Sequence, residues 1–143
     1  MPTSRATHQV IPHQGQTAHR LSLPHGDSVL VTSQGAQVLS WISQGRERLF
    51  LSPASHWDGR AIRGGVPVCW PQFNERGTLP KHGLARLATW QLVHTELDAV
   101  AAQLVFEWRD SDESRAAWPQ AFALRLSVAL SEGSLHVALE VHN

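Results

Sequence analysis

Three cations and one histidine lie on two short segments of the chain that could bind an anion. Arg63 precedes two glycines, so a planar, permanently charged guanidinium lies where the backbone can approach a ligand closely. Lys81, His82 and Arg86 follow downstream, and Arg86 could form a second corner of an anion site with Arg63. The positive charge of Lys81 disfavours the imidazolium form of His82. A neutral histidine can donate a hydrogen bond to a ligand oxygen or take part in proton transfer.

Each of these residues also has a structural interpretation. An arginine on a rigid surface loop is as readily solvated as bound to a ligand, and a lone histidine is more often structural than catalytic. The remaining histidines do not indicate a metal site, because zinc needs three or four ligands in a set geometry. His136 and His142 share strand parity but lack further ligands nearby in sequence, and four histidines in the polar amino-terminal region are expected to be solvated, namely His8, His13, His19 and His25. No metal site is predicted.

Composition excludes several classes of partner. The 143 residues include 12 Lys+Arg and 12 Asp+Glu, so no net charge attracts the chain to nucleic acid or to an anionic membrane. Cys69 is the only cysteine, which rules out an internal disulfide and fits a reducing compartment. No run of about 20 apolar residues could span a membrane, and no run of about 7–15 resembles a secretion signal. We therefore expect a soluble, cytoplasmic protein that binds neither nucleic acid nor membrane.

The dominant periodicity is two, which indicates strands. Apolar residues alternate over 122–130 and again over 135–141 across a Ser-Glu-Gly turn, which predicts a hairpin with one buried face. The same alternation over 102–108 predicts a further strand. Shorter strands are expected at the remaining apolar segments, 29–32, 38–42, 48–51 and 90–94, and one helical turn at 112–117. Many short strands separated by turns predict an all-β, antiparallel β-sandwich.

Two regions depart from this pattern. Residues 53–80 are rich in glycine and proline without a long periodic run, and a loop of that length in a compact domain is usually functional. Residues 1–19 form a polar amino-terminal segment that we expect to lie outside the domain and that could be disordered. The domain is then expected to span residues 20–143.

The two candidate segments also resemble a known family. The strings Ile62-Arg63-Gly64-Gly65-Val66-Pro67-Val68-Cys69-Trp70-Pro71 and His82-Gly83-Leu84-Ala85-Arg86, in this order, closely resemble the glucose-6-phosphate 1-epimerase branch of the aldose 1-epimerase family. The resemblance begins near residue 20 and continues through Trp118-Pro119 into the final hairpin. It implies part of a galactose-mutarotase-like supersandwich that acts on the anomeric carbon of a hexose 6-phosphate, without cofactor or metal.

The resemblance also implies roles for the candidate residues. Arg63 and Arg86 correspond to phosphate-binding cations, Lys81 could assist them, and His82 corresponds to the first active-site histidine, which positions the sugar near its ring oxygen. In this family a carboxylate base removes the proton of O1 while a histidine acid protonates the ring oxygen. Two departures are visible, since residue 84 is leucine where the family often has an aromatic residue, and 72–75 differs from the usual run.

Family members are much longer than this chain, and their second histidine and glutamate base lie downstream of residue 143. We therefore expect an amino-terminal half that is inactive alone and that self-associates through exposed strand edges. Two other interpretations remain open from the residues. The chain could be a non-catalytic module that binds a sugar or sugar phosphate, or a structural β-sandwich whose arginines and histidine bind nothing.

Overall fold

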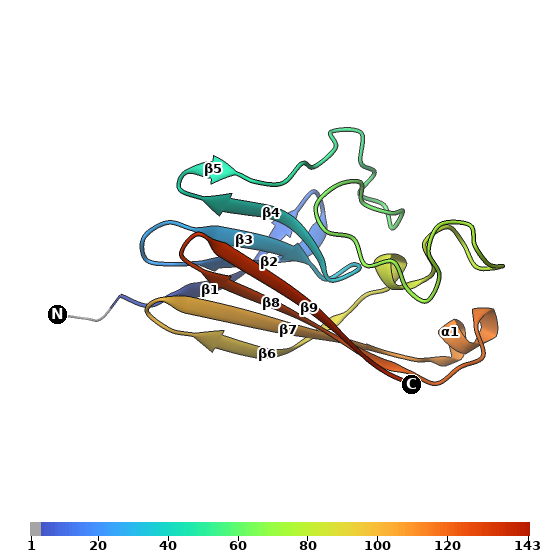
Figure 1. The fold of residues 1–143 in the computed structure, drawn as a ribbon. Helices are drawn as coiled ribbons and strands as arrows, with labels where there is room; N and C mark the ends of the chain where they lie inside the picture. Colours follow the sequence, from blue (N-terminus) through green and yellow to red (C-terminus); the bar gives the residue numbers. More distant parts are fainter. Residues whose placement is uncertain (1–3) are drawn as a thin grey trace.

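The computed structural model describes residues 4–143, which form two antiparallel sheets stacked face to face (Figure 1). The sheets have the strand orders β1-β2-β3-β4-β5 and β6-β7-β8-β9. Within each sheet, every strand pairs with its neighbours in sequence, as expected of consecutive hairpins. The strands are β1 Thr7–His13, β2 Gln16–Ser22, β3 Ser28–Thr32, β4 Gln37–Ser43, β5 Arg46–Glu47, β6 Gln91–Leu97, β7 Ala101–Arg109, β8 Ala123–Ser131 and β9 Ser134–His142. This architecture confirms the predicted all-β antiparallel sandwich.

The core lies between the two sheets, where the alternating apolar residues of both inner faces meet. Trp90, Leu104 and Phe106 are almost completely buried there. Burying a Leu or Phe side chain stabilises the fold by about 1.5–3 kcal/mol. The predicted helical turn is confirmed as α1 Asp112–Ala117, which begins at a capping box formed by Ser111 and Ser114. Among the described residues, none of the helices has the length and apolar character needed to cross a bilayer.

The β8–β9 hairpin confirms the most regular pattern in the sequence, but its second strand is only partly covered. Leu126 pairs with Leu139 and Leu124 with Val141, so these apolar side chains face the same side of the sheet. Leu124 and Leu126 are buried, whereas Leu139 and Val141 are 41% and 40% exposed. The expected single buried face therefore holds for β8 and fails toward the end of β9, because β9 is an edge strand.

The amino-terminal region differs from the expectation. Residues 7–22 form the β1–β2 hairpin at the edge of the first sheet, although the sequence predicted a polar segment outside the domain. His19, expected to be solvated, is 7% exposed, and its Nδ1 lies 3.0 Å from Nε2 of His8. Its ring also makes a T-shaped contact with the ring of Phe106, which lies on the second sheet. The sequence does not show the apolar alternation of a strand here, because only β2 has a buried face and a histidine occupies part of that face.

The strand expected at 48–51 is also wrong in its position. The strand here is the two-residue β5, and Leu51 makes only an isolated bridge with Gly64. The carboxylate of Glu47 accepts hydrogen bonds from the backbone N–H groups of Trp41 and Arg48 at 2.9 and 3.0 Å. The Glu47 carboxylate thus takes the place of a backbone carbonyl that would accept these hydrogen bonds in a longer β-ladder.

One buried carboxylate connects turns from both sheets. Asp27, in the β2–β3 turn, is 3% exposed. Its oxygens accept hydrogen bonds from the backbone N–H of Gly133 at 2.9 Å, in the β8–β9 turn, and from that of Gln44 at 3.2 Å, in the β4–β5 turn. The hydrogen bond from Gly133 is the main cause that holds the pKa of Asp27 below its usual range. The charged form therefore stabilises the fold.

We expect Asp27→Asn to remove about 1.5–3 kcal/mol of stability at pH 7, because a charge-assisted acceptor becomes a neutral amide. A carboxyl group with a lowered pKa in the folded state contributes stability above its unfolded pKa and loses it as pH falls through the folded pKa. The variant should therefore show a flatter loss of stability below about pH 4. Urea unfolding at several pH values measures this, with Asp98→Asn, an exposed carboxylate in the β6–β7 turn, as control. Equal acid dependence in Asp27→Asn and wild type would contradict it.

Candidate functional site

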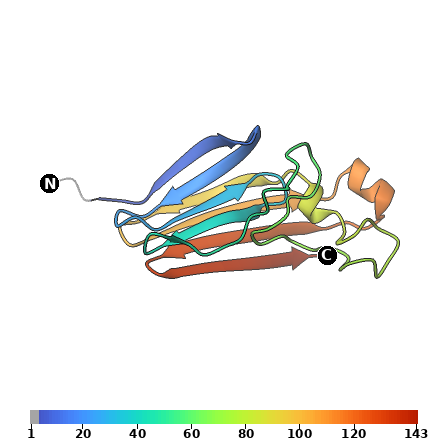
Figure 2. The ribbon, with the colours of Figure 1, turned by 90° about the horizontal axis from the view of Figure 1, so that it is seen from above.

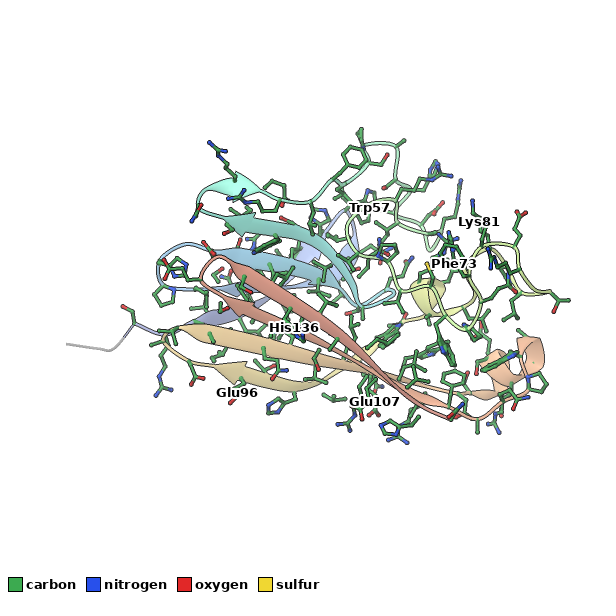
Figure 3. The ribbon with its side chains drawn as sticks, in the orientation of Figure 1. Trp57, Phe73, Lys81, Glu96, Glu107 and His136 are labelled. Carbon is green, nitrogen blue, oxygen red and sulfur yellow. The ribbon has the colours of Figure 1, made fainter. Side chains whose placement is uncertain are left out.

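The candidate residues lie on the long connection between β5 and β6, at one end of the sandwich (Figure 2). This connection contains a single short 3-10 helix, Ala85–Leu87, and otherwise consists of turns and isolated bridges. Figure 3 shows Trp57, Phe73 and Lys81 on these loops, with Glu107 on the sheet β6–β9. The loop predicted at 53–80 to be functional thus consists of turns and isolated bridges and lies at one end of the two sheets.

The two motif segments are joined to each other at Trp70. A parallel bridge links Trp70 to Gly83, and the backbone carbonyl of Trp70 accepts hydrogen bonds from Leu84 and Ala85 at 2.9 and 3.1 Å. Gly83 has φ +79°, and a Cβ there would lie 2.4 Å from the oxygen of Trp70. Only glycine fits this junction. The backbone pairing therefore places the Arg-Gly-Gly segment and the His-Gly segment next to each other.

The turn between β3 and β4 braces both segments. The side-chain amide of Gln37 donates to the carbonyls of Ile62 and Gly64 at 3.0 and 2.7 Å, which fixes the backbone on either side of Arg63. The backbone N–H of Gly35 donates to the carbonyl of Ala88 at 2.7 Å, just beyond Arg86. A Cβ on Gly35 would lie 2.8 Å from the carbonyl oxygen of Arg86. The segments that carry Arg63 and Arg86 are therefore held by one hairpin turn.

His82 is held in one orientation by the backbone of Asn74. The backbone N–H of Asn74 donates to Nδ1 of His82 at 3.0 Å, and the backbone N–H of His82 donates to the carbonyl of Asn74 at 3.0 Å. Because Nδ1 accepts, the proton of the neutral ring must be on Nε2. Partial burial is the main cause that lowers the pKa of His82, followed by the positive charges of Arg86 and Lys81. The site therefore holds a neutral histidine with a free Nε2–H donor.

Lys81, His82 and Arg86 form one cluster. The guanidinium of Arg86 donates from Nη2 to the backbone carbonyl of Lys81 at 2.9 Å, so the second arginine supports the backbone next to His82. Lys81 itself is exposed. Within residues 4–143, Nε of Arg86 is buried without a hydrogen-bond partner. The three residues therefore lie together on one loop segment, and the anion site expected between Arg86 and Arg63 stays a prediction.

Arg63 lies on the adjoining segment, and among the described residues it makes no hydrogen bond or ion pair with the cluster. Its backbone is fixed by Ser55, whose hydroxyl accepts from the Arg63 N–H and donates to the Arg63 carbonyl, each at 3.1 Å. The side chain is exposed, and its guanidinium makes no ion pair with any residue in the range 4–143. Neighbouring Arg60, by contrast, pairs with Asp58 at 2.9 Å. Arg63 is thus an unpaired cation on a fixed backbone.

Phe73 is a neighbour of the site that the sequence analysis missed. Its ring is 61% exposed and lies 5.1 Å from the ring of His82, at 57°. An exposed aromatic ring beside a hydrogen-bond donor suits the apolar face of a pyranose. The available signal was the aromatic residue within a polar loop. Trp70, Trp90, Trp108 and Trp118, by contrast, pack with one another or with Phe122.

The site is a loop surface and differs from the grooves of the molecule. One groove of about 630 Å³ lies between the 3-10 helix and α1, lined by residues such as Leu84, Leu87 and Trp108, and none of the four candidate residues lines it. No group of three or more His, Cys, Asp and Glu residues is placed to hold a metal ion in the described part of the chain. The chemistry available at the site is hydrogen-bond donation from His82 beside the cations Lys81 and Arg86, with Arg63 on the adjoining segment.

The chain is similar to known proteins in sequence and in fold. Residues 18–143 match the family model described as aldose 1-epimerase. A relative from Escherichia coli (strain K12), named "Putative glucose-6-phosphate 1-epimerase", is 45% identical over 95 residues, which cover 64% of this chain and 32% of that protein. A crystal structure titled as a putative mutarotase from Salmonella typhimurium has a TM-score of 0.84 at 31% identity and covers 95% of this chain and 50% of that one.

The fold is also that of more distant mutarotases. Galactose 1-epimerase from Lactobacillus acidophilus NCFM has a TM-score of 0.66 at 20% identity, over 96% of this chain and 48% of that chain. This likeness confirms the predicted galactose-mutarotase-like fold. The chain spans about half the length of these solved structures. Because the family model matches 18–143 and the segments at Arg63 and His82 are joined in one structure, the chain belongs to the aldose 1-epimerase family.

Proposed function

We propose that this chain supplies the amino-terminal part of a site that interconverts the α and β anomers of a hexose 6-phosphate. The observation that carries the proposal is the neutral Nε2–H donor of His82 beside the cations Lys81 and Arg86, on a loop joined to that of Arg63. The name of the Escherichia coli relative supports glucose 6-phosphate as the substrate class.

The proposed roles follow from the chemistry of each side chain. Arg63, Lys81 and Arg86 bind the phosphate, since guanidinium and ammonium groups donate charge-assisted hydrogen bonds to its oxygens. His82 donates from Nε2 to the ring oxygen of the sugar. The exposed ring of Phe73 packs against an apolar face of the pyranose.

In the proposed reaction a carboxylate base takes the proton of O1 while an acid delivers a proton to the ring oxygen. The C1–O5 bond breaks as the C1=O1 carbonyl forms, rotation about C1–C2 follows, and closure on the other face gives the second anomer. We propose that the base and the acid come from the part of the domain that this chain does not contain. Each such group contributes a factor of about 10²–10⁴, so the chain alone should bind without turnover.

A titration with glucose 6-phosphate, followed by NMR of the His82 and Phe73 ring signals, tests the binding role. We expect these signals to shift as glucose 6-phosphate is added. The dissociation constant obtained with glucose should be at least about tenfold higher, because a charge-assisted contact to the phosphate contributes about 1.5–3 kcal/mol. Equal affinity for the two sugars would contradict phosphate recognition. Saturable binding with no anomer exchange in any longer form of the protein would favour the alternative of a non-catalytic binding module.

We also propose that the chain self-associates through β9, whose inward-facing Leu139 and Val141 are 41% and 40% exposed at a sheet edge. Leu139→Lys should lower the apparent mass at high protein concentration, because a charge replaces the apolar contact. Ala138→Lys, on the opposite face of the same strand, is the matched control. Sedimentation velocity measures the effect, and an unchanged mass in Leu139→Lys would refute this role of the edge.

A further inference from the structure

The loop that carries His82 is closed by one buried side-chain amide. Gln72 is 9% exposed, and its Nε2 lies within hydrogen-bond distance of the backbone carbonyls of Asn74, Leu79 and Pro80, at 2.8, 3.1 and 3.4 Å. Its Oε1 accepts from the backbone N–H of Leu79 at 3.0 Å. The amide therefore ties the start of the loop to the residues that precede Lys81 and His82.

The packing around this amide leaves little freedom. A Cβ on Gly77 would lie 2.5 Å from Oε1 of Gln72, so the loop backbone wraps closely around the side chain. Asn74 and His82 both have left-handed backbone conformations, with φ of +52° and +64°. Such conformations cost energy in non-glycine residues and persist when surrounding contacts fix them.

The contacts of Gln72 and His82 converge on the backbone of a single residue, Asn74. The carbonyl of Asn74 accepts from Gln72 and from the backbone of His82, while the N–H of Asn74 donates to Nδ1 of His82. We infer that Gln72 is a positioning residue, which holds the backbone of Asn74 against His82 and thereby fixes the proton of the neutral imidazole on Nε2. This inference rests on the proposed function for its use, because a proton on Nε2 is what a sugar oxygen would meet.

Other charges face the same ring and must be separated from the effect of Gln72. Lys81 and Arg86 lower the pKa of His82 from the carboxyl side of the loop, after the larger effect of burial. Glu75 and Arg76 lie exposed on the loop itself. None of these charges determines which ring nitrogen carries the proton, whereas the Asn74 N–H does. The tautomer is therefore the readout specific to Gln72.

The test is Gln72→Met, which keeps the length of the side chain and removes its hydrogen bonds, followed by ring ¹⁵N NMR of His82 without sugar. Wild type should show a protonated Nε2 and an unprotonated Nδ1, and the variant should show a mixture of the two tautomers. Gln37→Met is the matched control, since Gln37 is equally a buried amide that donates to loop carbonyls, at Ile62 and Gly64. It should leave the His82 tautomer unchanged.

Unchanged His82 nitrogens in a folded Gln72→Met would overturn the inference. If that variant does not fold, the wild-type protein provides a second test. A scalar coupling is expected across the hydrogen bond from the Asn74 N–H to Nδ1 of His82. A proton found on Nδ1 would refute the inference. Neither readout uses a sugar. A failure here is therefore distinct from a failure of glucose 6-phosphate to bind.

Discussion

Replacing Arg63 with alanine should weaken the binding of glucose 6-phosphate by about 10–100-fold. A hydrogen bond to a charged group contributes about 1.5–3 kcal/mol, and each 1.4 kcal/mol changes a dissociation constant tenfold. Arg63 is the clearest of the cations to test, because its exposed guanidinium has no ion-pair partner within 4–143 and its backbone is held independently by Ser55. The fold should therefore be unaffected. Isothermal titration calorimetry measures the loss.

The matched control for this experiment is Arg60→Ala on the same loop. Arg60 is 66% exposed but already paired with Asp58, so it should contribute little to the phosphate. Glucose serves as the second control, because a sugar without phosphate should bind wild type and Arg63→Ala alike. A similar loss in Arg60→Ala would indicate a general effect of charge, and an unchanged affinity in Arg63→Ala would remove Arg63 from the site.

Replacing Gly83 with alanine should destabilise the chain by about 3 kcal/mol or more and separate the two motif segments. The left-handed conformation of Gly83 costs an alanine about 1–2 kcal/mol, and its Cβ would meet the Trp70 carbonyl at 2.4 Å, where only a backbone shift relieves the contact. That shift would break the hydrogen bonds from Leu84 and Ala85 to Trp70. Urea unfolding measures the loss of stability.

Gly45→Ala separates the two causes. Gly45 has φ +72° at the β4–β5 turn, but nothing lies within 4 Å of its Cβ position. Gly45→Ala should therefore lower the free energy of unfolding only by the cost of the left-handed backbone conformation, about 1–2 kcal/mol. Equal losses in Gly83→Ala and Gly45→Ala would show that the junction with Trp70 adds nothing to stability.

The strands β7, β8 and β9 were predictable because their apolar residues alternate with polar or small ones. The alternation over 122–130 and 135–141 fixes both the hairpin and its register. The β1–β2 hairpin was not predictable in the same way, since a polar edge strand buries little apolar surface. His19, paired with His8 and packed on Phe106, replaces the apolar residue that would have signalled it.

The order of the candidate residues in the chain was enough to identify them, but the sequence did not predict their geometry. No local pattern predicts that His82 adopts φ +64° or that the Asn74 N–H points at its Nδ1, because both depend on the buried amide of Gln72. The joint between Trp70 and Gly83 likewise connects positions too far apart for a local rule. The role of Phe73 beside His82 followed only from the folded loop.

Magnetisation-transfer NMR of glucose 6-phosphate with this chain added tests the central claim most directly, because one spectrum reports both binding and anomer exchange. The account predicts that the wild-type chain broadens the sugar signals and that Arg63→Ala and His82→Ala do not. It also predicts that the anomers exchange at the rate measured in buffer alone. Exchange well above that rate, abolished by His82→Ala, would contradict the proposal that the acid and base lie outside this chain. Sharp signals at saturating protein would contradict the site itself.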